Sequence, residues 1–255
     1  MPDSIPVLTI VVSYLALLFS LSVHESAHAA SAYWLEDDTA KRLGRMTLNP
    51  LPHIDILGTL VLPLVGMITG WRVLGWAKPV PVDPRNLSRK FTQRTGMAMV
   101  AGAGPASNLL LSLLCIPALA IAINSLVPNN VSPETKFNIF RLAMYTPVES
   151  FANIPIPGFS TDTVFLITFL GRMVSINIGL AIFNLLPFGP LDGARILRGF
   201  LPYNIVPLFD RVQPALTIAV LVLFFVGGIR YILFPFFWVI ENYYLNPLSR
   251  LLLGA

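Results

Sequence analysis

Long apolar runs constrain this chain more than any other feature of its sequence. They occupy about 5–35, 54–70, 96–127, 162–188 and 214–240, and a helix needs roughly 20 apolar residues to cross a bilayer. The composition agrees, because 55% of the 255 residues are hydrophobic and only 12% are charged, which lies outside the usual range of soluble domains. We therefore expect an integral membrane protein.

The first run is predicted to be a transmembrane helix, because no Lys or Arg precedes it and it is about twice the length of a signal-peptide core. The single cysteine, Cys115, lies within another apolar run, so neither a disulfide framework nor a thiolate metal cluster is expected. A net charge of +4 would suggest nucleic acid in a soluble chain. In a membrane protein, cytoplasmic Lys and Arg explain that charge better, so we expect the lipid bilayer and no nucleic acid as a partner.

The second run is too short and too broken for a normal span. Residues 54–70 include Pro63 and three glycines, and the proline-rich chain that follows is typical of extended structure. We predict a re-entrant or short apolar segment at 54–70, a small membrane-associated β element near 71–84, and a loop with one amphipathic turn around 137–144. The fold class is then all-α and polytopic, with about four transmembrane helices in a single domain, 1–255.

The sequence "HESAH" places three ionisable side chains at the end of the first run. Residues i and i+4 of a helix lie on one face, so His24 and His28 can bind one metal ion with Glu25 beside them. Two imidazole nitrogens suit zinc, and the glutamate can accept a proton from a water that the metal activates. This is the HExxH pattern of metalloproteases, and ionisable residues at membrane depth are usually functional.

A catalytic zinc needs a third protein ligand and one open position. The only other histidine is His53, so the third ligand is either that residue or a carboxylate. Asp192 is the strongest carboxylate candidate, because "NLLPFGPLDG" follows an apolar helix and its prolines and glycines break that helix. From local sequence alone, Asp192 could equally be a turn residue at the membrane surface.

Three motifs together give a resemblance. "HESAH", "GPASN" (104–108) and "NLLPFGPLDG" (184–193) occur in the order, and at separations, that resemble the site-2 protease family of intramembrane zinc metalloproteases. The resemblance covers about 8–200. It implies that His24, His28 and Asp192 bind one zinc ion and that Glu25 is the catalytic base. It also implies that Asn108 is a polar group near the scissile peptide.

"GRMTLNPLPHID" and "GWAKPVPVDP" resemble the compact bacterial branch of that family, although Ile56 stands where that branch usually has proline. No PDZ or CBS domain is expected. The resemblance implies a protease that cuts transmembrane protein substrates in or near their membrane segments. It also implies a multi-pass protein of the bacterial inner membrane.

Topology can be predicted from parity and charge. The family resemblance requires His24 and Asp192 to meet, so an odd number of spans must separate their helices. One span separates them if residues 54–70 do not cross the membrane. A further span near 134–155 would also restore parity, but Glu134, Lys136, Arg141 and Glu149 disfavour it. With four spans, twelve Lys and Arg residues fall on the face of the active site and three on the other. The positive-inside rule then places the active site toward the cytoplasm and the N-terminus outside.

A helical substrate must unwind before it can be cut, so its freed backbone groups need new partners. In "WAKPVPVDP" the residue Val80 keeps an N–H between two prolines, so we predict that the amide of Val80 binds the substrate by strand addition. A plain proline-stiffened connector is the alternative. His53 and Asp55 could support a zinc ligand or simply lie at the membrane interface.

The main alternative function is a zinc transporter or metal sensor without hydrolytic activity, since buried polar residues also mark ion pathways. A glutamate next to the first histidine favours hydrolysis, because a transport site gains nothing specific from a base there. A zinc site kept only as a structural support is the third possibility, and it would need a closed fourth coordination position.

Overall fold

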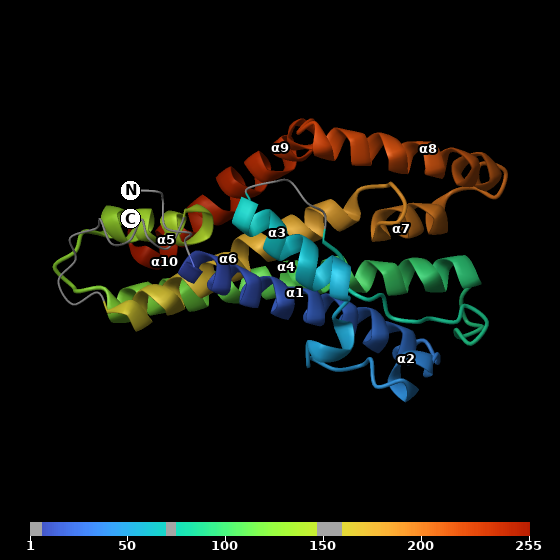
Figure 1. The fold of residues 1–255 in the computed structure, drawn as a ribbon, viewed down its shortest axis with the longest axis horizontal. Coiled ribbons are helices and arrows are strands. Elements are labelled where there is room, and N and C mark those ends of the chain that lie inside the picture. Colours follow the sequence, from blue (N-terminus) through green and yellow to red (C-terminus); the bar gives the residue numbers. More distant parts are fainter. Residues whose placement is uncertain (1–6, 70–74, 147–159) are drawn as a thin grey trace. The chain divides into compact units, whose positions relative to one another are not determined.

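The computed structural model describes residues 7–69, 75–146 and 160–255, and the regular secondary structure of these residues is helical (Figure 1). Four described helices are long and apolar enough to cross a membrane: α1 (Val7–Trp34), α4 (Gln93–Leu126), α6 (Thr161–Leu185) and α8 (Val206–Phe225). Their lengths of 28, 34, 25 and 20 residues meet the roughly 20 residues that a span requires. The predicted all-helical class with four long apolar helices is confirmed.

The second apolar run forms a shorter helical segment. A six-residue π-helix, Ile56–Val61, continues into the eight-residue α3, Leu62–Thr69. Asp55 caps its start by accepting a hydrogen bond from the Gly58 amide at 2.8 Å. Together these turns are too short to cross a bilayer.

The β element predicted near 71–84 is not found among the described residues. Residues 70–74 lie outside them, and 75–84 forms no strand. Pro79 and Pro81 carry no N–H, which blocks a ladder only along the edge to which their two nitrogens point. On the other edge, Trp76 N–H donates to Gly58 O at 3.0 Å and Lys78 N–H donates to His53 O at 2.9 Å, so these amides bond to the preceding helical turns.

The last apolar run also differs from its prediction. Instead of one helix over 214–240, α8 ends at Phe225, a turn follows, and α9 runs from Ile229 to Ile240. The turn contains Gly227 with φ of 79°, a left-handed conformation that glycine adopts readily. Hydropathy alone did not predict this break, because the apolar composition continues through it.

The segment predicted as a loop with one amphipathic turn contains a full helix, α5 (Pro133–Tyr145). Ser132 caps it by accepting a hydrogen bond from the Thr135 amide, and Pro133 occupies the first turn, where its missing N–H costs nothing. Residues 147–159 of the same predicted loop lie outside the described residues. The other described elements are short: α2 (Thr39–Arg42), a 3₁₀ turn (Leu51–His53), α7 (Asp192–Phe200), a π-helix (Glu241–Leu245) and α10 (Asn246–Leu253).

The chain forms two compact units. Unit 1 contains residues Met1–Leu17, Leu109–Ile178 and Phe234–Ala255, and unit 2 contains Leu18–Asn108 and Gly179–Leu233. The boundaries fall inside α1, α4, α6 and α9, so these helices contribute residues to both units. The single domain predicted from the sequence stays a prediction.

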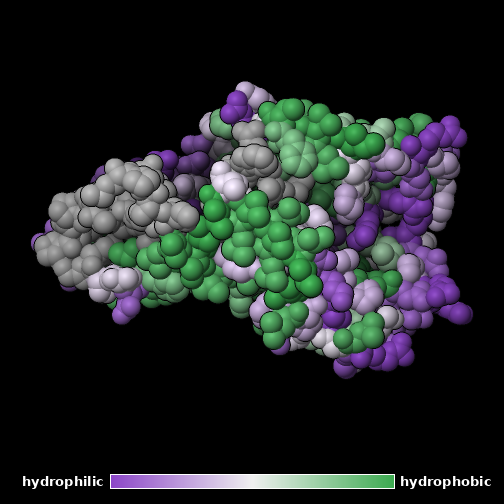
Figure 2. All heavy atoms as spheres, in the orientation of Figure 1, coloured by the Kyte–Doolittle hydropathy of each residue, from purple (hydrophilic) through white to green (hydrophobic). Residues whose placement is uncertain are grey.

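Unit 1 packs α10 against α5. Two ion pairs support it: Arg250 with Glu134 at 3.0 Å, and Arg141 with Glu241 at 3.3 Å. Within unit 2, hydrophobic side chains gather over α3 and along α8 (Figure 2), which is the surface expected of helices that face lipid. Unit 2 also contains every residue that the sequence predicted for the functional site.

Candidate metal centre

His24 and His28 lie one helical turn apart on α1, and both are buried. Their Nε2 atoms are 3.0 Å apart, and the two rings meet edge to face. The i, i+4 spacing therefore produces the convergent pair of nitrogens that the sequence predicted.

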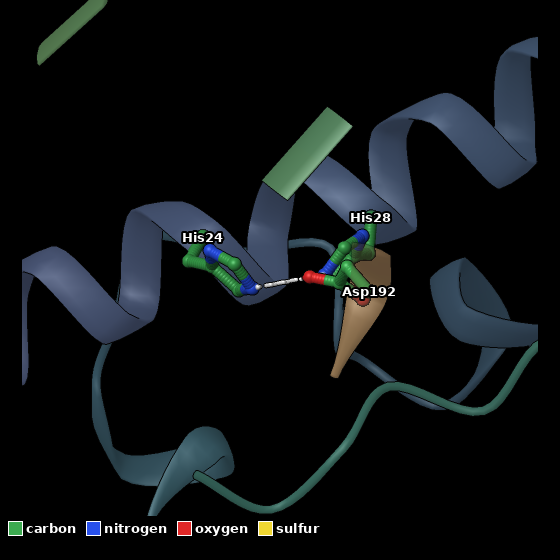
Figure 3. A group of neighbouring side chains, drawn as sticks. All are labelled: His24, His28 and Asp192. Atoms are coloured by element: carbon green, nitrogen blue, oxygen red, sulfur yellow. Dashed lines mark hydrogen bonds and ion pairs between the residues drawn. The ribbon is translucent and has the colours of Figure 1, made fainter. Parts of the chain in front are cut away.

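Asp192 reaches this pair from a distant part of the chain. It is the first residue of α7, and its Oδ2 lies 3.1 Å from His24 Nε2 and 3.3 Å from His28 Nε2 (Figure 3). Gly193 makes the approach possible, because a Cβ there would overlap the carbonyl oxygens of Leu185 and Leu186 at the end of α6. The chain just beyond α6 therefore meets the C-terminal half of α1, as the family resemblance required.

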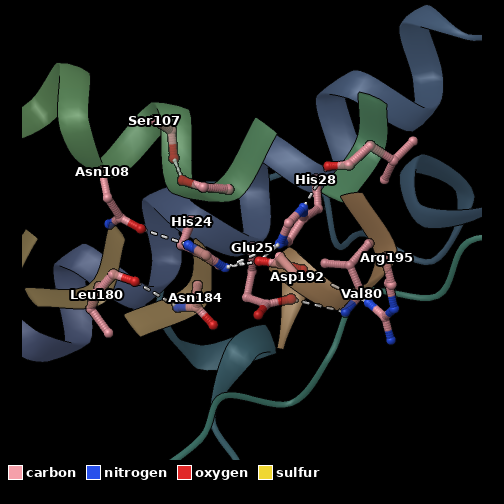
Figure 4. A network of polar contacts seen from close by, with 12 residues as sticks. His24, Glu25, His28, Val80, Ser107, Asn108, Leu180, Asn184, Asp192 and Arg195 are labelled. Atoms are coloured by element: carbon pink, nitrogen blue, oxygen red, sulfur yellow. Dashed lines mark hydrogen bonds and ion pairs between the residues drawn. The ribbon is translucent and has the colours of Figure 1, made fainter. Parts of the chain in front are cut away.

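The other nitrogen of each imidazole is held by α4. The Nδ1 of His24 lies 2.6 Å from Oδ1 of Asn108, and the Nδ1 of His28 lies 2.8 Å from the carbonyl oxygen of Val100 (Figure 4). An oxygen acceptor at each Nδ1 fixes the proton there, so both Nε2 atoms are left with lone pairs. Such a partner on the second nitrogen is the usual arrangement for metal-binding histidines.

Three acceptor atoms therefore point at one another: two imidazole nitrogens and one carboxylate oxygen. Among the described residues, this is the group of three potential metal-ligand side chains whose ligand atoms all lie within 4.8 Å of one another. Acceptors at this range repel unless a proton or a cation lies between them. Ligand atoms about 2.0–2.2 Å from a tetrahedral zinc lie roughly 3.3–3.5 Å apart, close to the separations seen here. The chemistry of the donor set and its spacing fit zinc.

Gly104 of α4 gives the imidazoles their space. A Cβ at this position would lie 2.5 Å from Nε2 of His28 and 2.6 Å from Cε1 of His24. A Cβ at Gly102 would meet nothing within 4 Å, so the close approach belongs to Gly104 alone.

Glu25 lies beside the cluster and is buried. Its Oε2 accepts a hydrogen bond of 2.9 Å from the backbone N–H of Val80 (Figure 4). The sequence predicted that this N–H would be free to bind substrate. In the structure it is bonded to Glu25 instead, so the segment 75–83 holds the glutamate in place.

The chain beyond Val80 is fastened to the end of α1. The backbone N–H of Asp83 donates to Oδ2 of Asp37 at 2.8 Å, and the N–H of Ser88 donates to the carbonyl oxygen of Leu35 at 2.6 Å. Burial favours the neutral form of Asp37, but hydrogen bonds from Thr39 and from the Asp83 amide outweigh it and lower the pKa of Asp37. The ionised carboxylate thus anchors the segment that carries Val80.

His53 is not part of the metal cluster. It is almost fully buried, and its Nε2 lies 2.9 Å from the carbonyl oxygen of Thr47, while its own carbonyl accepts from Lys78. Asp55 caps the segment that starts at Ile56. The described hydrogen bonds of His53 and Asp55 are therefore with residues 47–59 and with Lys78.

The structure also reveals contacts that sequence reasoning missed. The carbonyl oxygen of Val100 has no signature in the sequence, because any residue could supply it. Arg94 donates to the carbonyl oxygens of Arg198 and Leu201, at 2.5 Å from its Nη2 to the latter, and so caps the C-terminus of α7. Arg195 lies 3.9 Å from Oδ1 of Asp192.

Long apolar helices enclosing two histidines and an aspartate with a glutamate alongside define a membrane-embedded metallohydrolase site. The family model "Peptidase family M50" matches residues 12–227. YwhC of Bacillus subtilis (strain 168), whose name provisionally assigns it to the zinc metalloproteases, is 32% identical over 223 residues, which cover 87% of this chain and 83% of the relative. No solved structure gives a significant match.

The chain therefore belongs to peptidase family M50, the site-2 protease family of intramembrane zinc metalloproteases. The resemblance that the three sequence motifs indicated is confirmed. The zinc cofactor and the metallopeptidase activity follow from the family and agree with the cluster of His24, His28 and Asp192.

Proposed function

We propose that His24, His28 and Asp192 hold the catalytic zinc ion and that Glu25 is the general base for hydrolysis of a peptide bond. The observation that carries this proposal is the convergence of three lone-pair atoms within 3.0–3.3 Å, with each imidazole Nδ1 already bonded elsewhere. Zinc bound there supplies a Lewis acid that polarises the peptide carbonyl and activates water.

In this proposal Glu25 takes up the proton of the attacking water and later delivers it to the leaving amine. The bond from Val80 orients the carboxylate through Oε2, and the other oxygen, Oε1, is the proposed proton acceptor. Burial of the site keeps bulk water away from the reacting groups.

The proposed substrates are membrane proteins cut in or near a transmembrane segment. The family supports this substrate class, and the four long apolar helices place the chain in the same bilayer as such substrates. A substrate strand that bound the amide of Val80 would have to displace Glu25 from it. Asn108, predicted to lie near the scissile peptide, is fully buried and bonded to His24, so we propose that it acts by orienting that ligand.

Replacing the base tests the proposal directly. Glu25→Gln keeps the size and polarity of the side chain but cannot accept the proton, so cleavage of a model transmembrane substrate in detergent should fall by about 10²- to 10⁴-fold. Metal analysis of the purified variant should still find about one zinc ion per chain. Unchanged cleavage would favour the alternative, a zinc transporter or sensor without hydrolytic activity.

We further propose that the active site faces the cytoplasm in a bacterial inner membrane. The charge distribution of twelve to three supports this orientation. Single cysteines at Lys41, Arg89 and Arg198 should react with a membrane-impermeant reagent only from the cytoplasmic side, and one at Asn130 only from outside. Labelling at Arg89 from outside would reverse the orientation of α4.

A further inference from the structure

The segment that delivers Asp192 is held by two polar side chains of α8. Residues 186–191 connect α6 to α7 without helical structure, so much of their backbone needs partners outside a helix. The N–H of Gly189 donates to Oε1 of Gln213 at 2.7 Å. One turn further along α8, the hydroxyl of Thr217 donates to the carbonyl oxygen of Gly189.

Both backbone groups of Gly189 are therefore bonded to side chains of α8. Gln213 adds a longer contact of 3.4 Å from Nε2 to the carbonyl oxygen of Pro187. Since Gly189 lies only three residues before Asp192, these bonds fix the path of the chain just ahead of the carboxylate.

Apolar packing holds the same segment against α8 and α9. A buried cluster of Leu186, Val220 and Ile229 is joined by partly buried residues from the connecting segment and from both helices. The joining residues are Phe183, Phe188, Leu191, Phe224, Ile232 and Leu233. The connecting segment thus lies beside α8 (Figure 1), with apolar contacts around the two polar bonds.

The position of these polar residues is informative. The described part of α8 is one of the four long apolar helices, and much of its surface is exposed apolar side chains such as Ile218 and Val222. Polar groups in a helix that faces lipid are costly unless they are bonded, and so are open backbone groups. The bonds between Gly189 and these two side chains satisfy both requirements. Gln213 accepts from the N–H of Gly189 and Thr217 donates to its carbonyl oxygen, so the polar side chains of α8 and the open backbone groups are bonded to each other.

We propose that Gln213 and Thr217 are positioning residues for Asp192: they hold Gly189 so that the carboxylate reaches the two histidines. This inference rests on the proposed role of Asp192 as a zinc ligand. The role of Gln213 and Thr217 is indirect, since neither contacts the metal cluster. They set the geometry with which α7 presents its first residue.

Two pairs of variants separate the hydrogen bonds from the bulk of the side chains. Thr217→Val removes the hydroxyl at nearly constant shape, whereas Thr217→Ser keeps it. Gln213→Leu removes both polar groups, whereas Gln213→Glu keeps the oxygen that accepts from Gly189. Ile218→Ala, at an exposed position of the same helix, serves as the control for any change in α8.

Zinc affinity should be measured by competition with a chelator, and coordination geometry by the visible spectrum of the cobalt-substituted protein. We expect Thr217→Val and Gln213→Leu to weaken zinc binding by about 10-fold, to alter the cobalt spectrum, and to lower kcat with KM nearly unchanged. Thr217→Ser and Gln213→Glu should restore most of the affinity and the spectrum, and Ile218→Ala should match the wild type.

Wild-type zinc affinity and cobalt spectra in both Thr217→Val and Gln213→Leu would overturn the proposal. If one of those two variants fails to fold, the other decides the question: weakened zinc binding with an altered cobalt spectrum supports the proposal, and wild-type behaviour overturns it. Asp192→Ala tests the underlying ligand assignment separately. If that variant keeps its zinc, the proposed site fails; if it loses zinc while the α8 variants do not, only the positioning role fails.

Discussion

The candidate metal centre has two sides, the histidine pair on α1 and Asp192 at the start of α7, and they are positioned in different ways. On α1, the two histidines converge because they are four residues apart on one helix, so the geometry is local and any straight helix would produce it. Asp192, in contrast, follows the non-helical connection between α6 and α7, and its position depends on contacts with α4 and α8.

This difference shows where the precision of the site comes from. The α1 turn needs only an acceptor for each Nδ1, which Asn108 and Val100 of α4 provide. Asp192 needs three supports: Gly193 directly after it, the cap that Arg94 gives to the C-terminus of α7, and the bonds that hold Gly189, three residues before it. We therefore expect the aspartate side to be the more sensitive to changes far along the chain.

The largest expected effect comes from replacing Asp192 itself. Asp192→Ala removes one of the three proposed ligands, so it should abolish cleavage and weaken zinc retention by at least about 10-fold, as losses outside the ligand set already cost about 10- to 100-fold. His53→Ala is the control, because that histidine contacts Thr47 rather than the cluster. Metal analysis should find about one zinc per chain in His53→Ala. Zinc lost from the His53 variant and kept in the Asp192 variant would reverse the comparison.

A smaller effect tests whether the histidine pair on α1 also depends on tertiary contacts. Asn108→Ala leaves Nδ1 of His24 without its acceptor, so zinc affinity measured by chelator competition should fall by about 10- to 100-fold. Asn108→Asp keeps an acceptor oxygen and should recover part of the loss. If Asn108→Ala instead bound zinc normally and raised KM, Asn108 would belong to the substrate site that the sequence predicted.

The smallest effect concerns the proposed base, Glu25, a residue of α1 whose carboxylate is bonded to the amide of Val80. Val80→Pro removes the N–H that donates to Glu25, and it also replaces the side chain and fixes the backbone φ angle. We expect kcat to fall by about 10-fold, or about 1.4 kcal/mol in activation free energy, with zinc content unchanged. Val80→Ala keeps the N–H and should be close to wild type. A rise in KM at constant kcat would assign this amide to the substrate.

Several features could be predicted from sequence because their causes are local. Hydropathy gave the number of long helices, the i, i+4 spacing gave the histidine pair, and the prolines and glycines around Asp192 indicated a broken helix. The family resemblance required His24 and Asp192 to meet, and the distance of 3.1 Å between His24 Nε2 and Asp192 Oδ2 agrees.

Other features failed because their causes are not local. The proline pattern of 75–84 suggested a strand with a free edge, but its amides bond to Gly58, His53 and Glu25. Whether an N–H is free depends on what packs against it. The break at Gly227 was missed because apolar composition does not distinguish one helix from two.

The sequence by itself determined the class of protein, its long helices and the chemical identity of the donor set, since residue type and helical spacing carry that information. Only the tertiary structure decided which nitrogen of each histidine faces Asp192, where the amide of Val80 is bonded, and how Gln213 and Thr217 hold the chain before Asp192. Each of these depends on hydrogen bonds between residues more than 20 positions apart. Such pairings are set by how the helices pack, which no local pattern of residues records.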